Sequence, residues 1–128
     1  MLSVEQIDHI ALTVSDVERS VAWYREILGL ERRHEKEWGS NPAFMYAGMT
    51  GLALFAAAES QSDPAPDHRR TRIMRHLAFR VDRENFALSQ AELNDKNIGF
   101  HFEDHGIAHS IYFFDPDGYE IELTTWEV

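Results

Sequence analysis

Apolar residues alternate with polar ones in some segments of the chain and recur at helical spacing in others. The first alternating segment, Ile7–Val14, is rich in β-branched residues and predicts a strand. Val17, Val21, Tyr24 and Leu28 then recur at the spacing of one helix face. The chain therefore opens with a predicted strand followed by a predicted helix.

This helix carries a signal at each end. Ser15 followed by Glu18 fits a capping box and places Ser15 at the N-cap. Gly29 suits a left-handed residue after the last turn. Three shorter strands are predicted to follow, at Leu30–Trp38, Ala43–Ala47 and Leu52–Ala57.

The second half of the chain repeats this order. Ile73–Val81 predicts a strand, and Asp82 can cap a helix that runs to about Lys96. The turn Asp115–Gly118 has Pro and Gly where a tight turn needs them. The remaining strands are predicted at Ile98–Glu103, Ala108–Phe114 and Tyr119–Thr125.

The two halves are related by a constant offset. His9 precedes His76 by 67 residues, and Gly51 precedes Gly118 by 67 residues. Such an offset favours a duplicated unit over two halves that are similar by chance. We predict an α+β fold of two βαβββ modules within one structural domain. The modules are expected at residues 1–60 and 72–128, joined by a linker at 61–71 within the polar stretch Glu59–Thr71.

Strand alternation places potential metal ligands on one side of the predicted sheets. In the strand near Ile73–Val81, the side that carries His76 and Arg80 is opposite the apolar side. His9 occupies the matched position in the first module, and Glu122 follows the turn of the second. Two imidazoles and a carboxylate suit a divalent metal with open positions. Each of these residues taken singly is more often an ordinary strand residue.

Composition narrows the range of functions. The chain has 128 residues and no Cys, which excludes disulfides, thiolate ligands and a cysteine nucleophile. The net charge of −10 disfavours nucleic-acid and anionic-membrane partners. No secretory signal and no long apolar run are visible in the sequence, so we expect a cytoplasmic protein.

Three stretches of the sequence form a recognisable pattern: Ile7–Leu12 (IDHIAL), Trp23–Leu30 (WYREILGL) and Tyr112–Leu123 (YFFDPDGYEIEL). Together they resemble the vicinal oxygen chelate superfamily, also called the glyoxalase, bleomycin-resistance and dioxygenase superfamily. The resemblance implies paired βαβββ modules that form a cup around a divalent metal. It maps the metal ligands onto His9, His76 and Glu122.

The sequence departs from glyoxalase I, which has a fourth ligand, a carboxylate, in its first half. The 67-residue offset maps Glu122 back to Phe55, and a slip of one residue gives Leu54. Neither side chain can bind a metal. A three-ligand site remains, as in ring-cleaving dioxygenases and fosfomycin-resistance enzymes of the superfamily.

A second fragment is similar to the extradiol dioxygenases. The residues that match their order and spacing are His105, Ile111, Tyr112, Pro116, Gly118 and Glu122. Glu103 departs, because it stands where a small or aliphatic residue is usual. By this resemblance His105 is an acid/base group and Tyr112 is a hydrogen-bond donor to substrate, provided that His105 lies on the loop before the strand. His109 is a weaker candidate for the acid/base role.

These observations favour a metal-dependent enzyme with a small-molecule substrate, assembled as a homodimer. Fe²⁺ and extradiol-type chemistry are favoured, and Mn²⁺, Ni²⁺, Co²⁺ or Zn²⁺ with lyase, isomerase or thiol-transfer chemistry is the alternative. A metal-free binding protein is the alternative from another class. Arg80 can bind a substrate anion or pair with Glu120. The basic run His68–Arg75 is expected to be a solvated linker, with contact to an anionic substrate or partner left open.

Overall fold

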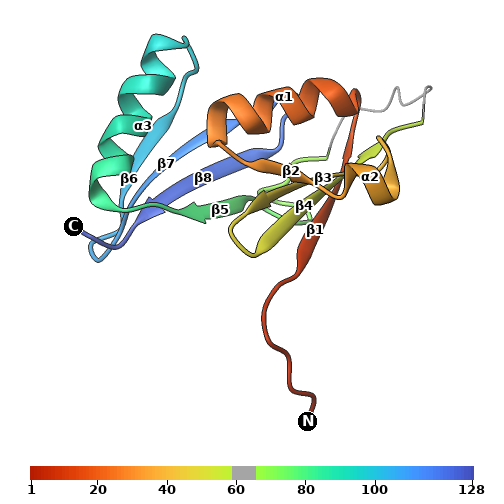
Figure 1. Cartoon of the computed structure of the whole chain (residues 1–128). Coiled ribbons are helices and arrows are strands. Elements are labelled where there is room, and N and C mark those ends of the chain that lie inside the picture. Colours follow the sequence, from red (N-terminus) through yellow and green to blue (C-terminus); the bar gives the residue numbers. More distant parts are fainter. Residues whose placement is uncertain (59–65) are drawn as a thin grey trace. The chain divides into compact units, whose positions relative to one another are not determined.

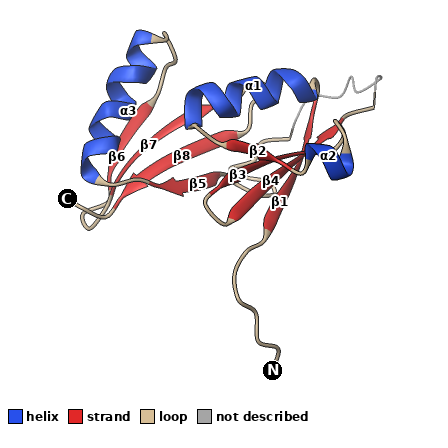
Figure 2. Ribbon diagram, viewed as in Figure 1, coloured by secondary structure: helices blue, strands red, loops and turns tan. Residues whose placement is uncertain are grey.

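The computed structural model describes residues 1–58 and 66–128, which form two compact units, Met1–Asp63 and Pro64–Val128 (Figure 1). Each unit has a four-stranded sheet and one long helix (Figure 2). This is the predicted α+β fold of two repeated βαβββ modules. The predicted linker lies partly outside the described residues, and its described part contains a turn in which Thr71 N–H donates to the carbonyl of Asp67.

The first unit has the strand order β1-β4-β3-β2. Strand β1 pairs in parallel with β4, and the other pairs are antiparallel. The elements of this unit are β1 (His9–Val14), α1 (Val17–Leu28), β2 (Glu31–Arg33), α2 (Glu35–Trp38), β3 (Ala43–Ala47) and β4 (Thr50–Ala56).

Two local predictions for this unit were wrong. The N-cap of α1 is Asp16, whose carboxylate accepts from the backbone N–H of Arg19, and Ser15 instead accepts from the Arg19 guanidinium. The strand expected at Leu30–Trp38 stops at Arg33. His34 takes a left-handed conformation with φ 65°, which ends the strand and starts the short helix α2.

The second unit has the equivalent strand order, β5-β8-β7-β6. Strand β5 pairs in parallel with β8, as β1 does with β4 in the first unit. The elements are β5 (Leu77–Arg80), α3 (Arg83–Asp95), β6 (His101–Asp104), β7 (His109–Phe114) and β8 (Glu120–Thr125). None of the helices in the described residues is long and apolar enough to cross a membrane.

Alternation along the strands of the second unit separates its core from its polar face. Leu77 lies opposite Ile121, and Ile111 lies opposite Leu123, and all four are buried. Helix α3 contacts β8. The other face of the sheet carries the polar residues described next, as the sequence predicted for β5 and β8.

Candidate metal site and polar network

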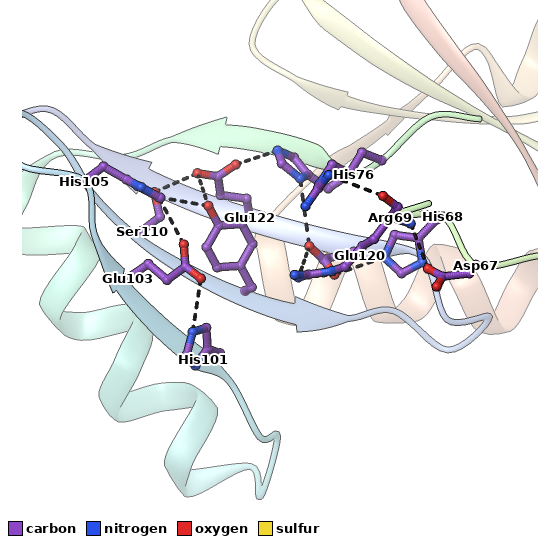
Figure 3. A network of polar contacts seen from close by, with 12 residues as sticks. Asp67, His68, Arg69, His76, His101, Glu103, His105, Ser110, Glu120 and Glu122 are labelled. Atoms are coloured by element: carbon purple, nitrogen blue, oxygen red, sulfur yellow. Dashed lines mark hydrogen bonds and ion pairs between the residues drawn. The ribbon is translucent and has the colours of Figure 1, made fainter. Parts of the chain in front are cut away.

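His76 and Glu122 meet on the polar face of the second sheet. Leu77 pairs with Ile121 and Ala78 with Glu122, so His76, just before β5, lies beside the strand that carries the glutamate. Nε2 of His76 is 2.8 Å from Oε2 of Glu122 (Figure 3). These are the two predicted ligands that lie in the same unit, and the structure brings them together.

The second oxygen of Glu122 is held by neighbours on β7. Ser110 donates from its hydroxyl to Oε1 of Glu122 at 2.6 Å, and Tyr112 donates to the same oxygen at 3.2 Å. Ser110 and Glu122 are buried, so these bonds are shielded from water. The glutamate is therefore fixed through Oε1, and Oε2 is the oxygen directed toward His76.

His105 joins this network through Tyr112. It lies in the loop between β6 and β7, as its predicted role requires, with Nε2 3.0 Å from the Tyr112 hydroxyl. Burial and the neighbouring Glu122 carboxylate raise the pKa of Tyr112, which keeps the phenol protonated and able to donate. Glu103 extends the network toward solvent, with Oε2 3.7 Å from Nε2 of His105.

A second buried carboxylate, Glu120, lies on the same face and was not among the predicted site residues. Its side chain is 1% exposed, and Arg69 donates to Oε1 and Oε2 at 2.8 Å each. Nε2 of His68 is 3.1 Å from Oε2. Burial raises the pKa of Glu120, but the bonds from Arg69 and His68 outweigh it and hold that pKa below its ordinary value. Strand alternation predicts Glu120 on the same face as Glu122, but its partners His68 and Arg69 lie 52 and 51 residues away in the sequence, where no local pattern indicates them.

The basic run His68–Arg75 therefore differs from the solvated linker that was expected. Its first two residues, His68 and Arg69, are tied to the buried Glu120 of β8. Arg80, predicted to bind a substrate anion or to pair with Glu120, is exposed and lies over the ring of Trp126 at 5.9 Å. Glu120 is held by Arg69 and His68 instead, and Arg80 pairs in the sheet with Thr124, four residues further along β8.

His9, the third predicted ligand, starts β1 in the first unit. Its Nδ1 is 2.7 Å from Oδ2 of Asp8, and its ring meets Phe44 edge-on at 5.5 Å. Within residues 1–58 and 66–128, no group of three or more His, Asp or Glu side chains is arranged to hold a metal ion. The pair of His76 and Glu122 nevertheless fits a metal in its chemistry, because an imidazole nitrogen and a carboxylate oxygen face each other at 2.8 Å.

Known proteins resemble this chain along almost its whole length. The profile of the Glyoxalase/Bleomycin resistance protein/Dioxygenase superfamily matches residues 6–123. The metallothiol transferase FosB of Staphylococcus saprophyticus is 30% identical, covering 95% of this chain and 78% of the relative. The catechol-2,3-dioxygenase of Bacillus subtilis is 24% identical, covering 99% of this chain but 47% of the relative.

A solved structure agrees with these sequence matches. The crystal structure of a glyoxalase/dioxygenase from Nostoc punctiforme has a TM-score of 0.80 and 29% identity, covering 98% of this chain and 97% of that one. Fold, sequence and the predicted motifs lead to one conclusion. The chain belongs to the Glyoxalase/Bleomycin resistance protein/Dioxygenase superfamily.

Proposed function

We propose that the protein is a divalent-metal-dependent enzyme that joins a thiol to an electrophilic small molecule. The observation that carries this proposal is the pairing of His76 Nε2 with Glu122 Oε2 at 2.8 Å, with the other glutamate oxygen held by Ser110. The 30% identity to a metallothiol transferase across 95% of the chain supports thiol transfer over ring cleavage.

We expect His9, His76 and Glu122 to be the metal ligands. Nitrogen and oxygen ligands of this kind accept several divalent ions, so Mn²⁺, Ni²⁺, Co²⁺ and Zn²⁺ are candidates beside the Fe²⁺ favoured from sequence. A bound ion would act as a Lewis acid that polarises a substrate oxygen and stabilises developing negative charge.

The thiol has to come from a second substrate, because the chain contains no Cys. With an epoxide as the electrophile, a C–S bond forms as a ring C–O bond breaks, and the opened oxygen gains a proton while the thiol loses one. His105 is the side chain placed to accept the thiol proton, since imidazole titrates near neutral pH. Burial and the Glu122 carboxylate raise the pKa of Tyr112, so its phenol stays protonated; its single O–H, which donates to Oε1 of Glu122 in the free protein, would turn to the substrate oxygen when substrate binds.

Arg80 is the residue proposed to bind an anionic group of the substrate. Its register partner is Thr124, two residues beyond Glu122, so it projects from the same face as the glutamate. The guanidinium is exposed, and its planar donors suit a carboxylate or a phosphonate. We therefore expect a substrate that has an anionic group for Arg80 to bind and an electrophilic centre for the thiol to attack.

The test starts with metal content. The protein is stripped with a chelator, reloaded separately with each candidate ion and dialysed. It is then incubated with glutathione or cysteine and a panel of epoxides that includes fosfomycin. We expect about one equivalent of metal per chain and a thiol adduct detected by mass spectrometry, with both lost in His76→Ala and retained in His101→Ala. A chain that retains no metal under any loading condition would instead support a metal-free binding protein.

Extradiol ring cleavage is the second candidate, and the contact of His105 with Tyr112 at 3.0 Å favours it. The resemblance assigns these two residues to acid/base and hydrogen-bonding roles on a catechol. Protein loaded anaerobically with Fe²⁺ is mixed with a catechol panel in air, and oxygen consumption and the yellow ring-cleavage product are measured. Turnover there, with no thiol adduct from any epoxide, would replace the thiol-transfer proposal by this one.

A further inference from the structure

We propose that Glu120 is a positioning residue for His76: its carboxylate accepts the proton of Nδ1 and leaves the Nε2 lone pair directed at a metal. The inference deepens the proposed function and rests on His76 being a metal ligand. From the sequence, Glu120 was named only as an alternative partner of Arg80, with no role toward His76.

The imidazole of His76 lies between two carboxylates of the same strand. Nε2 faces Glu122 at 2.8 Å, and Nδ1 faces Oε1 of Glu120 at 3.8 Å (Figure 3). Residues two apart on a strand project from the same face, about 7 Å apart along it. The ring of His76 therefore has one nitrogen directed at each glutamate.

Nδ1 of His76 is buried and has no hydrogen-bond partner within the described residues. A buried polar atom without a partner is unfavourable and calls for an explanation. Oε1 of Glu120 lies 3.8 Å from this nitrogen, and a shift of less than about 1 Å would bring it within hydrogen-bonding distance. Nδ1 of His76 and Oε1 of Glu120 are thus slightly too far apart for a hydrogen bond, and a small rotation of the imidazole ring would close the gap.

The position of the ring proton decides whether His76 can bind a metal. With the proton on Nε2, the ring donates to Glu122 and has no lone pair for a metal there. With the proton on Nδ1, Nε2 and Oε2 of Glu122 present two lone pairs to each other, which repel unless a cation lies between them. An anionic acceptor at Nδ1 favours the second tautomer and so favours metal binding.

Glu120 is fixed and charged by groups other than His76. Arg69 donates to both of its oxygens, and His68 contacts Oε2. A carboxylate can accept about four hydrogen bonds, so Oε1 can accept one from Nδ1 in addition. The segment that carries His68 and Arg69 thus holds the acceptor in place beside the predicted ligand.

The first module shows the same arrangement built from a different residue. Nδ1 of His9 is 2.7 Å from the carboxylate of Asp8, its neighbour in sequence. The 67-residue offset maps Asp8 onto Arg75, which cannot accept a proton, so His76 has no such neighbour. Glu120 supplies the missing carboxylate from the neighbouring strand β8, so each predicted histidine ligand has a carboxylate near its Nδ1.

The test measures Zn²⁺ affinity by competition with a chromophoric chelator in the full-length chain. We expect Glu120→Gln to bind Zn²⁺ about 10–100-fold more weakly than the wild type. Glu103→Gln is the matched control, because Glu103 lies on the same face but contacts His101 and His105 rather than His76. Its affinity should stay within about threefold of the wild-type value.

The ¹⁵N chemical shifts of His76 in metal-free protein give a second readout, which a purely structural role for Glu120 would not change. We expect Glu120→Gln to shift the ring from the Nδ1–H tautomer toward Nε2–H. If Glu120→Gln does not fold by circular dichroism, Glu120→Asp replaces it, since it keeps the charge for Arg69 but withdraws the carboxylate from His76. Wild-type affinity together with an unchanged tautomer ratio would overturn the role of Glu120 alone. Wild-type protein that binds no Zn²⁺, Mn²⁺ or Fe²⁺ would overturn the metal site and this inference together.

Discussion

The hydroxyl of Ser110 donates a hydrogen bond of 2.6 Å to Oε1 of Glu122, and both side chains are buried. Ser110 pairs with Thr124 in the β7–β8 register, so it reaches Glu122 along the diagonal of the same face. A carboxylate fixed through one oxygen has little freedom to rotate. Its other oxygen is therefore held in the direction of His76 before any metal binds.

Removing this hydroxyl should weaken metal binding without unfolding the protein. We expect Ser110→Ala to lower metal affinity about 10-fold, near the low end for groups that orient ligands, because Tyr112 still donates to Oε1. The measurement is chelator competition with Mn²⁺ or Zn²⁺. Ser89→Ala is the matched control, since Ser89 donates to a carbonyl within α3, far along the chain from the site. Equal affinities for the two variants would contradict the orienting role of Ser110.

The N-terminus of α1 gives a prediction that separates two adjacent residues. Asp16 accepts from the backbone N–H of Arg19, whereas the side chain of Ser15 accepts from the guanidinium of that arginine in an exposed contact. We expect Asp16→Ala to lower the free energy of unfolding by about 1 kcal/mol. Ser15→Ala should lower it by less than about 0.5 kcal/mol. Urea denaturation of both variants checks the order, and a larger loss in Ser15→Ala would restore the capping box predicted from sequence.

The contact between Arg69 and Glu120 predicts how stability depends on pH. The pKa of Glu120 is lowered in the folded state, so its contribution to stability is complete above the ordinary value of 4.5 and is lost as the pH falls through the lowered value. In Arg69→Met, burial would raise that pKa instead. We expect this variant to be less stable than the wild type at pH 7, with a difference that shrinks as the pH falls from the raised pKa of the variant, above 4.5, to the lowered pKa of the wild type.

Urea denaturation of metal-free protein between pH 7 and pH 3 measures this difference. Arg72→Met is the control, because Arg72 is an exposed arginine of the same basic run. Its stability should follow the wild-type curve at every pH. A constant offset between Arg69→Met and the wild type, independent of pH, would show that Arg69 acts through packing and not through the charge of Glu120.

Most of the fold could be predicted from the sequence, because strand alternation is a local pattern and the 67-residue offset shows that the second half of the chain repeats the first. The errors fell where local patterns compete. Ser15 and Asp16 are both good N-cap residues, and the backbone selected the second. The segment Leu30–Trp38 was predicted as a single strand, but the left-handed His34 splits it into β2 and α2.

The candidate site could be predicted only in part, because its contacts join distant segments. Strand alternation predicted that Glu122 lies on the face that carries His76, and β5 and β8 are neighbours in the sheet. The role of Ser110 required the register of β7 against β8, which sequence alone does not give. The tie between Arg69 and Glu120 spans 51 residues, and nothing in either residue's neighbourhood indicates it.

Two histidines near β7 were candidates for one acid/base role, and the structure places them on different faces of the sheet. His105 lies in the loop before β7 and contacts the hydroxyl of Tyr112. His109 is the first residue of β7, so it alternates with Tyr112 and faces the other way, toward the ring of Phe102. The hydroxyl of Tyr112 in turn donates to Glu122, which makes His105 the histidine connected to the predicted metal ligand.

This difference predicts a clear separation between two variants of the metal-loaded protein. His105→Gln should lower kcat by about 10²–10⁴-fold, the usual contribution of a general acid or base, because the proton acceptor next to Tyr112 is lost. His109→Gln should leave kcat within about threefold, since its ring contacts Phe102 and Asp104 instead. Both variants should hold the metal as tightly as the wild type, so any loss of rate belongs to proton transfer. The rate of thiol-adduct formation, or of ring cleavage if that is the reaction found, is measured at saturating substrate for both variants. If His109→Gln lowers kcat and His105→Gln does not, the acid/base role belongs to the histidine on the other face of β7.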